Sequence, residues 1–290
     1  MAASPPGMDG ALDLAPEGEG RWSAAGAAGQ AGGDVVFGGR LLALMVLAES
    51  RSEPEKAVKT IHAGFVRPAV GPAPVTVVRQ GVQSGRTVGF ATIDVLQGGR
   101  VCARAQVMTS AGDDSVVSHS PPLPAVAPPD RSPPIPPGVL ACPGAELRVV
   151  DGVDLWSADA PVGAPELFVW TRYPVPGRPP PALDPAASQA VLAWATTGFL
   201  VGTALRPHAG VGQGAAHVTL STGVLTHSVT FHRRFDAGAW HLMAHRSVFA
   251  GGGRAYGVGD VFDEEGHLVA SFAQDSLIRR RPPEAAGARL

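Results

Sequence analysis

One uncharged amide, Gln274, lies in the apolar run EGHLVASFAQD near the C-terminal end of the sequence. Apolar and polar residues alternate around it, which is typical of a strand with one buried face. A buried amide needs hydrogen-bond partners, because leaving its oxygen and its NH2 group unpaired is unfavourable. Gln274 is therefore either a structural tie or a group positioned to bind a small molecule.

Other residue patterns that carry chemistry give weaker signals. The sequence has no Gly-x-Ser-x-Gly segment, so a serine nucleophile of the α/β-hydrolase kind is not expected. The run GGGRAYGVG lacks the lysine of a phosphate loop and the spacing of a dinucleotide site, which favours a tight turn before a strand. His241 and His245 have the spacing of helical zinc ligands, but on a strand they lie too far apart to share a metal. Packing roles are expected for both, and no metal site is predicted.

Arginines could contact phosphate groups, since the guanidinium group suits bidentate phosphate binding. A solvated sheet edge explains the same residues equally well. The candidates are Arg233, Arg234, Arg246 and Arg254.

Composition and charge limit the classes of function. The chain has 290 residues, 45% of them hydrophobic, enough for one large domain or two small ones. A net charge of −2 gives no case for nucleic acid or an anionic membrane as a partner. No run of 18 apolar residues occurs and the N-terminus does not resemble a secretory signal. Cys102 and Cys142 form neither a metal motif nor a disulfide framework, so a cytoplasmic location is expected.

The elements that must position Gln274 fall into two halves. In the first half, one strand is expected near 11–23, and the continuous apolar run 36–52 predicts a buried helix. Gly38 and Gly39 at its entrance would allow close backbone approach. Strand-like runs joined by hairpin turns follow at 57–68, 73–83, 86–97 and 100–110.

The proline-rich segment separates these elements from the second half. Its proline density is typical of an extended linker. Asp184 and Pro185 predict the start of a second long helix, 184–205. The strands expected around it are 146–157, 165–173, 216–224, 225–234, 239–249, 254–263 and 267–279.

The two halves show a faint internal repeat. Each has a helix followed by similarly spaced segments: His62, Arg86 and Gly99 in the first half correspond to His227, Arg254 and Gly266 in the second. The dipeptide Ala-Gln recurs at 105–106 and 273–274. The repeat predicts two copies of one unit, a helix inside a curled antiparallel sheet.

Several motifs of the chain match a known family. In the first half they are FGGRLLAL and IHAGFVRP; in the second they are HSVTFHRRF, Trp240, GGRAYGVG, DEEGHLVAS, Gln274 and Arg279. Together, over residues 11–281, they resemble the double-hotdog acyl-CoA thioesterases, the type II or TesB-like family. The resemblance implies an α+β fold of two tandem hotdogs, each a long helix wrapped by an antiparallel sheet, with the two sheets joined into one. The domains would be 11–112 and 145–281, with a linker at 113–144 and flexible tails at 1–10 and 282–290.

The resemblance also implies a mechanism without a covalent nucleophile. In the family, an Asp on the second helix, a Thr or Ser on the following strand and the late Gln orient a water toward the thioester carbonyl. Gln274 matches the Gln, but the helical Asp falls in AWATTGFL, where Thr197 is the match and Thr196 its neighbour. Because a threonine accepts a proton poorly, we expect slow, altered or lost hydrolysis.

The strand hydroxyl of the family falls on an apolar residue, Val224. Thr222 lies on the same face of the expected strand and could substitute, together with Ser221. The remaining candidates for substrate contact are Gly38, Gly39 and His62.

Three functions stay open from the sequence. The first is hydrolysis of an acyl-CoA thioester to the free acid and coenzyme A without a cofactor. The second is an inactive hotdog protein that binds acyl-CoA. The third, a hydratase, would need Asp114 and His119 to face the acyl tunnel. Trp194 and Phe199 are expected in the core, with the lining of an acyl channel as the alternative. The partner expected in each case is an acyl thioester, and a homo-oligomer of double hotdogs is compatible with the family.

Overall fold

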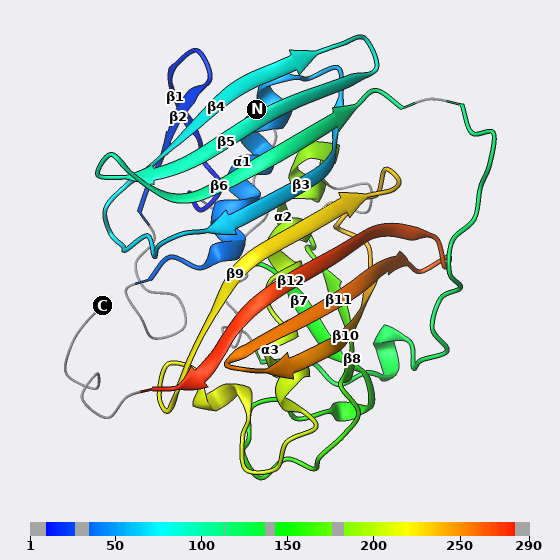
Figure 1. The fold of residues 1–290 in the computed structure, drawn as a ribbon. Helices are drawn as coiled ribbons and strands as arrows, with labels where there is room; N and C mark the ends of the chain where they lie inside the picture. The colour runs from blue at the N-terminus through cyan, green and yellow to red at the C-terminus, as the bar shows by residue number, and fades with distance from the viewer. Residues whose placement is uncertain (1–9, 27–34, 113, 137–142, 176–182, 282–290) are drawn as a thin grey trace.

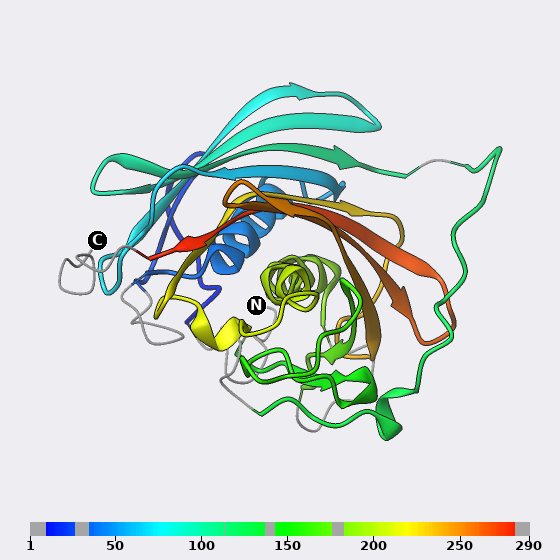
Figure 2. The same ribbon diagram turned by 60° about the horizontal axis from the view of Figure 1, so that its bottom comes forward.

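The computed structural model describes residues 10–26, 35–112, 114–136, 143–175 and 183–281. In this part of the chain, one antiparallel sheet of 12 strands curves around a pair of helices, as Figures 1 and 2 show. The strand order is β1-β2-β4-β5-β6-β3-β9-β12-β11-β10-β8-β7, so all strands of the first half precede all strands of the second. The expected α+β fold with two joined sheets is confirmed.

The first half contains the helix α1, Gly38–Ser52. Its strands are β1 (Ala15–Gly18), β2 (Arg21–Ala24), β3 (Ala57–Phe65), β4 (Val75–Ser84), β5 (Val88–Gln97) and β6 (Arg100–Ser110). The second half contains the helices α2, Pro185–Thr196, and α3, Leu200–Leu205. Its strands are β7 (Glu146–Val149), β8 (Glu166–Arg172), β9 (Leu220–Phe231), β10 (His241–Gly251), β11 (Arg254–Asp263) and β12 (Leu268–Arg280).

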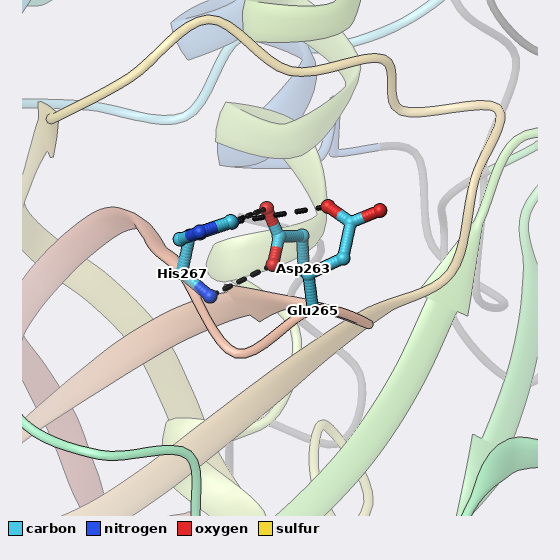
Figure 3. Close-up of side chains that lie close together, drawn as sticks. All are labelled: Asp263, Glu265 and His267. Carbon is cyan, nitrogen blue, oxygen red and sulfur yellow. Dashed lines mark hydrogen bonds and ion pairs between the residues drawn. The ribbon is translucent and has the colours of Figure 1, made fainter.

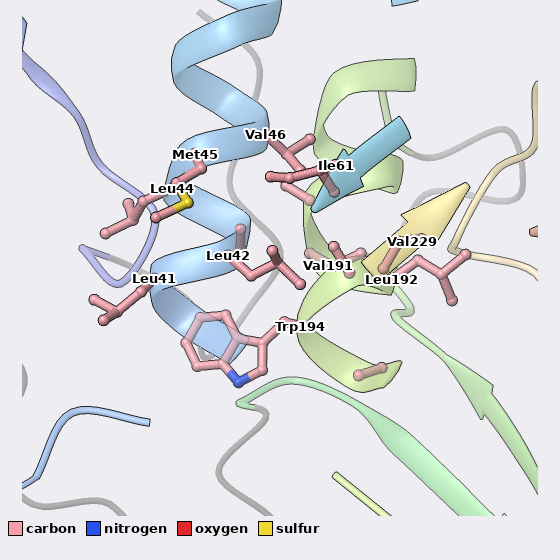
Figure 4. Close-up of a cluster of buried hydrophobic side chains, with 14 of the residues drawn as sticks. Leu41, Leu42, Leu44, Met45, Val46, Ile61, Val191, Leu192, Trp194 and Val229 are labelled. Atoms are coloured by element: carbon pink, nitrogen blue, oxygen red, sulfur yellow. The ribbon is translucent and has the colours of Figure 1, made fainter. Parts of the chain in front are cut away.

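Helix α1 is buried on nearly all sides, as its continuous apolar sequence predicted. It packs against α2, and Figure 4 shows side chains of both helices interleaving with Ile61 of β3 and Val229 of β9. Gly39 is the closest point, because a Cβ atom there would lie 2.4 Å from Thr197 Oγ1 and 2.7 Å from the carbonyl oxygen of Trp194. The expected close approach is confirmed at this glycine.

The helical stretch Pro185–Leu205 is long and apolar enough to cross a membrane by length and composition. However, 89% of its most apolar window is buried inside the molecule. This stretch is therefore explained as the core of the second half, covered by α1 and the sheet.

The prediction of a single helix over 184–205 was wrong in one respect, because this stretch forms two helices, α2 and α3, with a break between them. The hydroxyls of Thr196 and Thr197 donate to the carbonyl oxygens of Ala193 and Trp194, 2.9 Å and 2.8 Å away. Such local bonds compete with helical ones, and Gly198 follows directly. The predicted start is confirmed, because Asp184 accepts a hydrogen bond from the Ala187 N–H.

Two other expected boundaries were also wrong. The strands expected at 216–224 and 225–234 are one strand, β9, because β12 pairs with it along its whole length. Near the expected break, the strand instead has a β-bulge at Leu225. The single strand expected near 11–23 is the hairpin of β1 and β2.

Strands β3 and β9 pair at the centre of the sheet and join the two halves. Each carries a bulge, at Lys59 in β3 and at Leu225 in β9. Two residues after each bulge comes an inward residue paired with the next strand: Ile61 with Val107, and His227 with Gln274. The equivalent of His227 is therefore Ile61, and the expected match to His62 was one residue out of step.

That single step changes the face of the sheet on which a side chain lies. His62 is exposed on the outer face, where its Nδ1 is 2.8 Å from the Ser228 hydroxyl. Gln106, which pairs with His62, is also exposed. The first half thus has two apolar residues where the second half has a buried histidine and a buried amide.

The proline-rich segment packs against the second half. Leu123, Val126 and Ala127 lie against a cluster that includes Trp170 and Phe262. The indole N–H of Trp170 donates to the carbonyl oxygen of Ala127 at 2.9 Å. In Figure 1 this segment runs from β6 past the ends of β11 and β12.

Candidate active site

Gln274 is buried at the centre of a chain of hydrogen bonds. Its Oε1 lies 2.9 Å from His227 Nδ1, and its Nε2 donates to Ser276 Oγ at 2.8 Å. On the other side of the ring, His227 Nε2 lies 2.9 Å from Thr196 Oγ1. The chain therefore runs from β12 through β9 to the end of α2, and all four side chains are at most 2% exposed.

The hydrogens of this chain can be placed in two ways. If the ring hydrogen is on Nδ1 of His227, it donates to Gln274 Oε1, and Thr196 donates its one hydroxyl hydrogen to Nε2. The Ser276 hydroxyl, which accepts from Gln274, then keeps its own hydrogen for a further acceptor.

The second arrangement moves the ring hydrogen to Nε2. His227 then donates to Thr196, which donates to the carbonyl oxygen of Ala193 at 2.9 Å. The Gln274 amide turns over, so that its NH2 group faces Nδ1 and its oxygen accepts from Ser276. The single hydroxyl hydrogen of Thr196 is used for His227 in the first arrangement and for the Ala193 carbonyl oxygen in the second. In both arrangements Gln274 is bonded to His227 and to Ser276.

Burial keeps the histidine neutral. Desolvation lowers the pKa of His227 to about 4, while the hydrogen bond to Gln274 opposes this and the nearby His245 adds to it. At neutral pH the ring is therefore an uncharged link in the chain. No carboxylate forms a hydrogen bond or ion pair with any of its four members among the residues described.

The N-terminus of α1 lies beside this chain, through the contact of Gly39 with Thr197. No side chain caps this helix end and its first turn holds no acidic residue. The first N–H groups of a helix have no partner within the helix and attract negative charge. Within the described part of the chain, the N–H groups of Gly38 and Gly39 have no hydrogen-bond partner, whereas that of Arg40 donates to the Phe37 carbonyl oxygen at 3.0 Å. The start of α1 therefore has two available donors, and Gly39 lies next to Thr197.

Models of one protein family match most of the chain. Its N-terminal domain model, described as "Acyl-CoA thioesterase N-terminal domain", matches residues 27–110. The model described as "Acyl-CoA thioesterase C-terminal domain" matches residues 118–278. The chain belongs to the acyl-CoA thioesterase family.

Individual relatives agree with this family. Acyl-CoA thioesterase 2 of Haemophilus influenzae is 37% identical over 97 residues, a match that spans 33% of each chain. Human acyl-coenzyme A thioesterase 8 is 25% identical over 277 residues, covering 85% of this chain and 81% of the human protein. Among solved structures, acyl-CoA thioesterase II TesB2 from Mycobacterium marinum has a TM-score of 0.76 at 25% identity, covering 96% of this chain and 99% of that one.

In this acyl-CoA thioesterase, the predicted site residues do not all meet. Thr196, rather than Thr197, forms the hydrogen bond to His227. Thr197 is buried between Trp194 and the start of α1, without a hydrogen bond to Gln274. Gly38 lies beside Phe65, since a Cβ atom at Gly38 would be 3.1 Å from that ring.

The other predicted residues lie further along β9. Val224 pairs with Ser276, directly after the Gln274–His227 pair and the bulge. Thr222 is one inward position beyond, opposite Ile278, and Ser221 pairs with Arg279. The hydroxyl nearest to Gln274 at this end of the thioesterase is therefore that of Ser276, across the sheet from Val224.

Sequence reasoning missed one member of this chain, Ser276. It follows Gln274 by two residues, so both side chains lie on one face of a strand, and this signal was present in the sequence. From the sequence, His227 is expected to be a hydrogen-bonded histidine at the junction of sheet and helix, and its bonds to Gln274 and Thr196 confirm this. Its role depends on its pairing with Gln274, which is 47 residues away, and no local pattern encodes that pairing.

The remaining candidates lie elsewhere. His241 and His245 are both buried in β10, where Nδ1 of each lies near a backbone carbonyl oxygen, of Ala239 at 2.9 Å and of Leu167 at 3.3 Å. Asp114 and His119 are exposed in the segment after β6. Trp194 and Phe199 are fully buried core residues.

A cluster of Asp263, Glu265 and His267 lies in the turn between β11 and β12, as Figure 3 shows. Asp263 closes this turn, since its carboxylate accepts from the His267 N–H at 2.8 Å and lies 3.1 Å from its ring Nδ1. Glu265 and His267 are exposed. These contacts account for the cluster as turn structure.

Proposed function

We propose that this acyl-CoA thioesterase hydrolyses its substrate with a water held beside Gln274, releasing the free acid and coenzyme A. Membership of the family and the double-hotdog fold support the reaction. The observation that carries the site is the buried chain Ser276–Gln274–His227–Thr196, which ends beside the N-terminus of α1.

We assign the thioester carbonyl to the start of α1. As water attacks, negative charge develops on the carbonyl oxygen, and N–H groups aimed at it stabilise the transition state. The first turn of α1 has such groups free, whereas the N-terminus of α2 is occupied by the Asp184 carboxylate. Gly38 and Gly39 leave room for the substrate backbone at that end.

The general base is the weak part of this site. The resemblance of the motif AWATTGFL puts Thr197 where the family has an Asp. His227 is already bonded at both ring nitrogens. General base catalysis contributes roughly 100- to 10,000-fold to a rate. We therefore expect hydrolysis to be slow, with the attacking water deprotonated by solvent.

The absence of a carboxylate bonded to the Gln274 chain, among the residues described, favours a second candidate function. Without a carboxylate bonded to the Gln274 chain, the protein would bind acyl-CoA and retain it uncleaved. Sequestration of the thioester would then be its activity. The cytoplasm remains the expected compartment for both functions, and a water molecule is the only co-reactant that hydrolysis needs.

Release of free thiol from acyl-CoA substrates of several chain lengths tests these functions. The parent is compared with Thr197→Asp, which restores a carboxylate beside the α1 N-terminus, where negative charge is favourable. We expect Thr197→Asp to raise the rate by about 100-fold or more. Thr222→Asp, with its carboxylate further along β9, is the matched control and should give no gain.

Two outcomes decide between the functions. A parent that releases no thiol but binds acyl-CoA tightly favours sequestration over hydrolysis. Equal rates for the parent, Thr197→Asp and Thr222→Asp would contradict the assignment of the missing base to position 197.

A further inference from the structure

A cavity of about 300 Å³ opens at the start of α2, at the end of the helix pair opposite the Gln274 chain. It is bounded by the beginning of β3, the end of β6, the first turn of α2 and the segment after β9. The lining residues are Ala57, Val58, Lys59, Ser110, Ala111, Gly112, Pro185, Gln189 and Phe231 to Phe235. We propose that this cavity is a second ligand site, which binds an anion joined to an apolar body.

Among the described residues that line the cavity, every charged side chain is basic. These are Lys59, Arg233 and Arg234. Arg233 and Arg234 are exposed and neither has a hydrogen-bond or ion-pair partner within the described ranges. Two carboxylates that follow or precede lining residues in the sequence have partners of their own, since Asp184 caps Ala187 and Asp236 accepts from the N–H groups of Leu183 and Gly238. A concave site lined by one sign of charge concentrates ligands of the opposite sign.

Lys59 brings a cation to the wall of the cavity. It occupies the bulge of β3, and its Nζ donates to the carbonyl oxygen of Phe231 at 2.7 Å. Burial lowers its pKa, so a bound anion would relieve an existing desolvation penalty. Two of its three ammonium hydrogens remain available for a ligand.

The rest of the wall suits an apolar group. Val58 and Phe231 are buried, and the Phe231 ring stacks on that of Phe235 with centroids 6.2 Å apart. The amide of Gln189 is held in place by its hydrogen bond to the Val58 carbonyl oxygen at 2.7 Å. The apolar part of a ligand whose anionic head group lies at the arginines would therefore extend along the partly exposed Phe235 ring, which the buried Phe231 supports.

The sheet register explains why this cavity would bind without cleaving. Counting from the two bulges, Phe231 of β9 corresponds to Phe65 of β3, which lies beside Gly38 at the start of α1. The cavity thus occupies the place equivalent to the α1 end of the helix pair. The inward sheet pair of the first half that corresponds to His227 and Gln274 is Ile61 and Val107, which offer no polar group to a substrate.

This inference goes beyond hydrolysis and does not depend on it. Both products of a thioesterase carry the required chemistry: a free fatty acid has a carboxylate on an alkyl chain, and coenzyme A has phosphates on a nucleoside. Decanoate and coenzyme A are therefore the probes that distinguish the two sources of the anion.

The experiment is isothermal titration of the full-length chain with each probe. The double variant Arg233→Ala/Arg234→Ala removes the two exposed cations, and Arg100→Ala, at an exposed arginine at the start of β6, is the control. We expect the double variant to bind at least one probe 10-fold or more weakly, and Arg100→Ala to bind like the parent. The difference should shrink as salt is raised, because exposed charges are screened.

The variant Gln274→Ala distinguishes ligand binding in the cavity from ligand binding at the candidate active site. Binding that survives in Gln274→Ala and is weakened in the arginine double variant supports the second site, even if thiol release is absent throughout. Failure of the parent to bind either probe, or equal affinities of the parent and the double variant, would overturn the proposal. A loss of binding in Gln274→Ala alone would place the ligand at the first site and also contradict it.

Discussion

The Gln274 Oε1 atom lies 2.9 Å from His227 Nδ1, and the two residues form a direct pair between β12 and β9. The hydrogen bond therefore follows from the strand register. Since the ring is also bonded to Thr196 at the end of α2, it fixes the position of the helix relative to the sheet. Substitution of Gln274 should therefore alter both the rate of hydrolysis and the stability of the fold.

Gln274→Ala should lower thiol release about 100-fold or more, measured in the parent or in Thr197→Asp. It should also lower the free energy of unfolding by about 1–3 kcal/mol, because His227 Nδ1 and Ser276 lose a buried partner. Gln106→Ala, an exposed amide at the repeated Ala-Gln dipeptide, is the matched control and should change neither quantity. A loss of stability without any change in kcat would make Gln274 a structural tie only.

Gly39→Ala should separate the two helices, because its Cβ atom would lie 2.4 Å from Thr197 Oγ1. Overpacking of this kind destabilises a protein by about 1–3 kcal/mol, which urea unfolding would measure. Gly64→Ala, in β3, adds a methyl group with no atom within 4 Å and should stay within about 1 kcal/mol of the parent. Equal effects of the two substitutions would argue against tight packing at Gly39.

Stability should fall as the pH drops from about 6.5 toward 4. Burial lowers the pKa of His227 and of His245 to about 4, so the unfolded chain binds more protons in this window. At pH 5 each histidine should lower the free energy of unfolding by about 2 kcal/mol relative to neutral pH. Urea unfolding at pH 7.5, 6 and 5 measures the change.

The variant His245→Leu tests how much of this pH dependence of stability comes from the His245 ring. His245 packs edge-on against Phe199 and Phe272, and its Nε2 has no partner among the residues described. The variant should lose less stability than the parent between pH 7.5 and 5. Parallel curves for the two proteins would assign the pH dependence to other groups.

Arg79→Ala should destabilise the first half strongly. Arg79 donates to both carboxylate oxygens of Glu49, a side chain with 0% exposure, and also contacts Glu53. Removing the arginine leaves a buried, unpaired carboxylate, which typically destabilises by about 3–5 kcal/mol. Arg21→Ala breaks the exposed pair with Glu17 and should change stability by at most about 1 kcal/mol. Thermal unfolding of both variants compares the two pairs.

The elements were largely predictable because local patterns encode them. Continuous apolar residues predicted the buried helix α1, Asp184 and Pro185 predicted the start of α2, and alternation predicted most strands. The break after Thr196 was not predictable from hydropathy, because it depends on hydroxyl groups bonding to their own helix.

The sequence by itself determined the residue types of the site. They are an amide in a strand and two threonines at a helix end, in a segment, AWATTGFL, that contains no carboxylate. Only the tertiary structure decided which of these groups meet. The bulge at Leu225 and the pairing of β9 with β12 turn His227 and Ser276 inward beside Gln274, and leave His62 outside. A shift of one residue reverses the face of a strand, so site geometry depends on pairing between distant segments that local sequence does not specify.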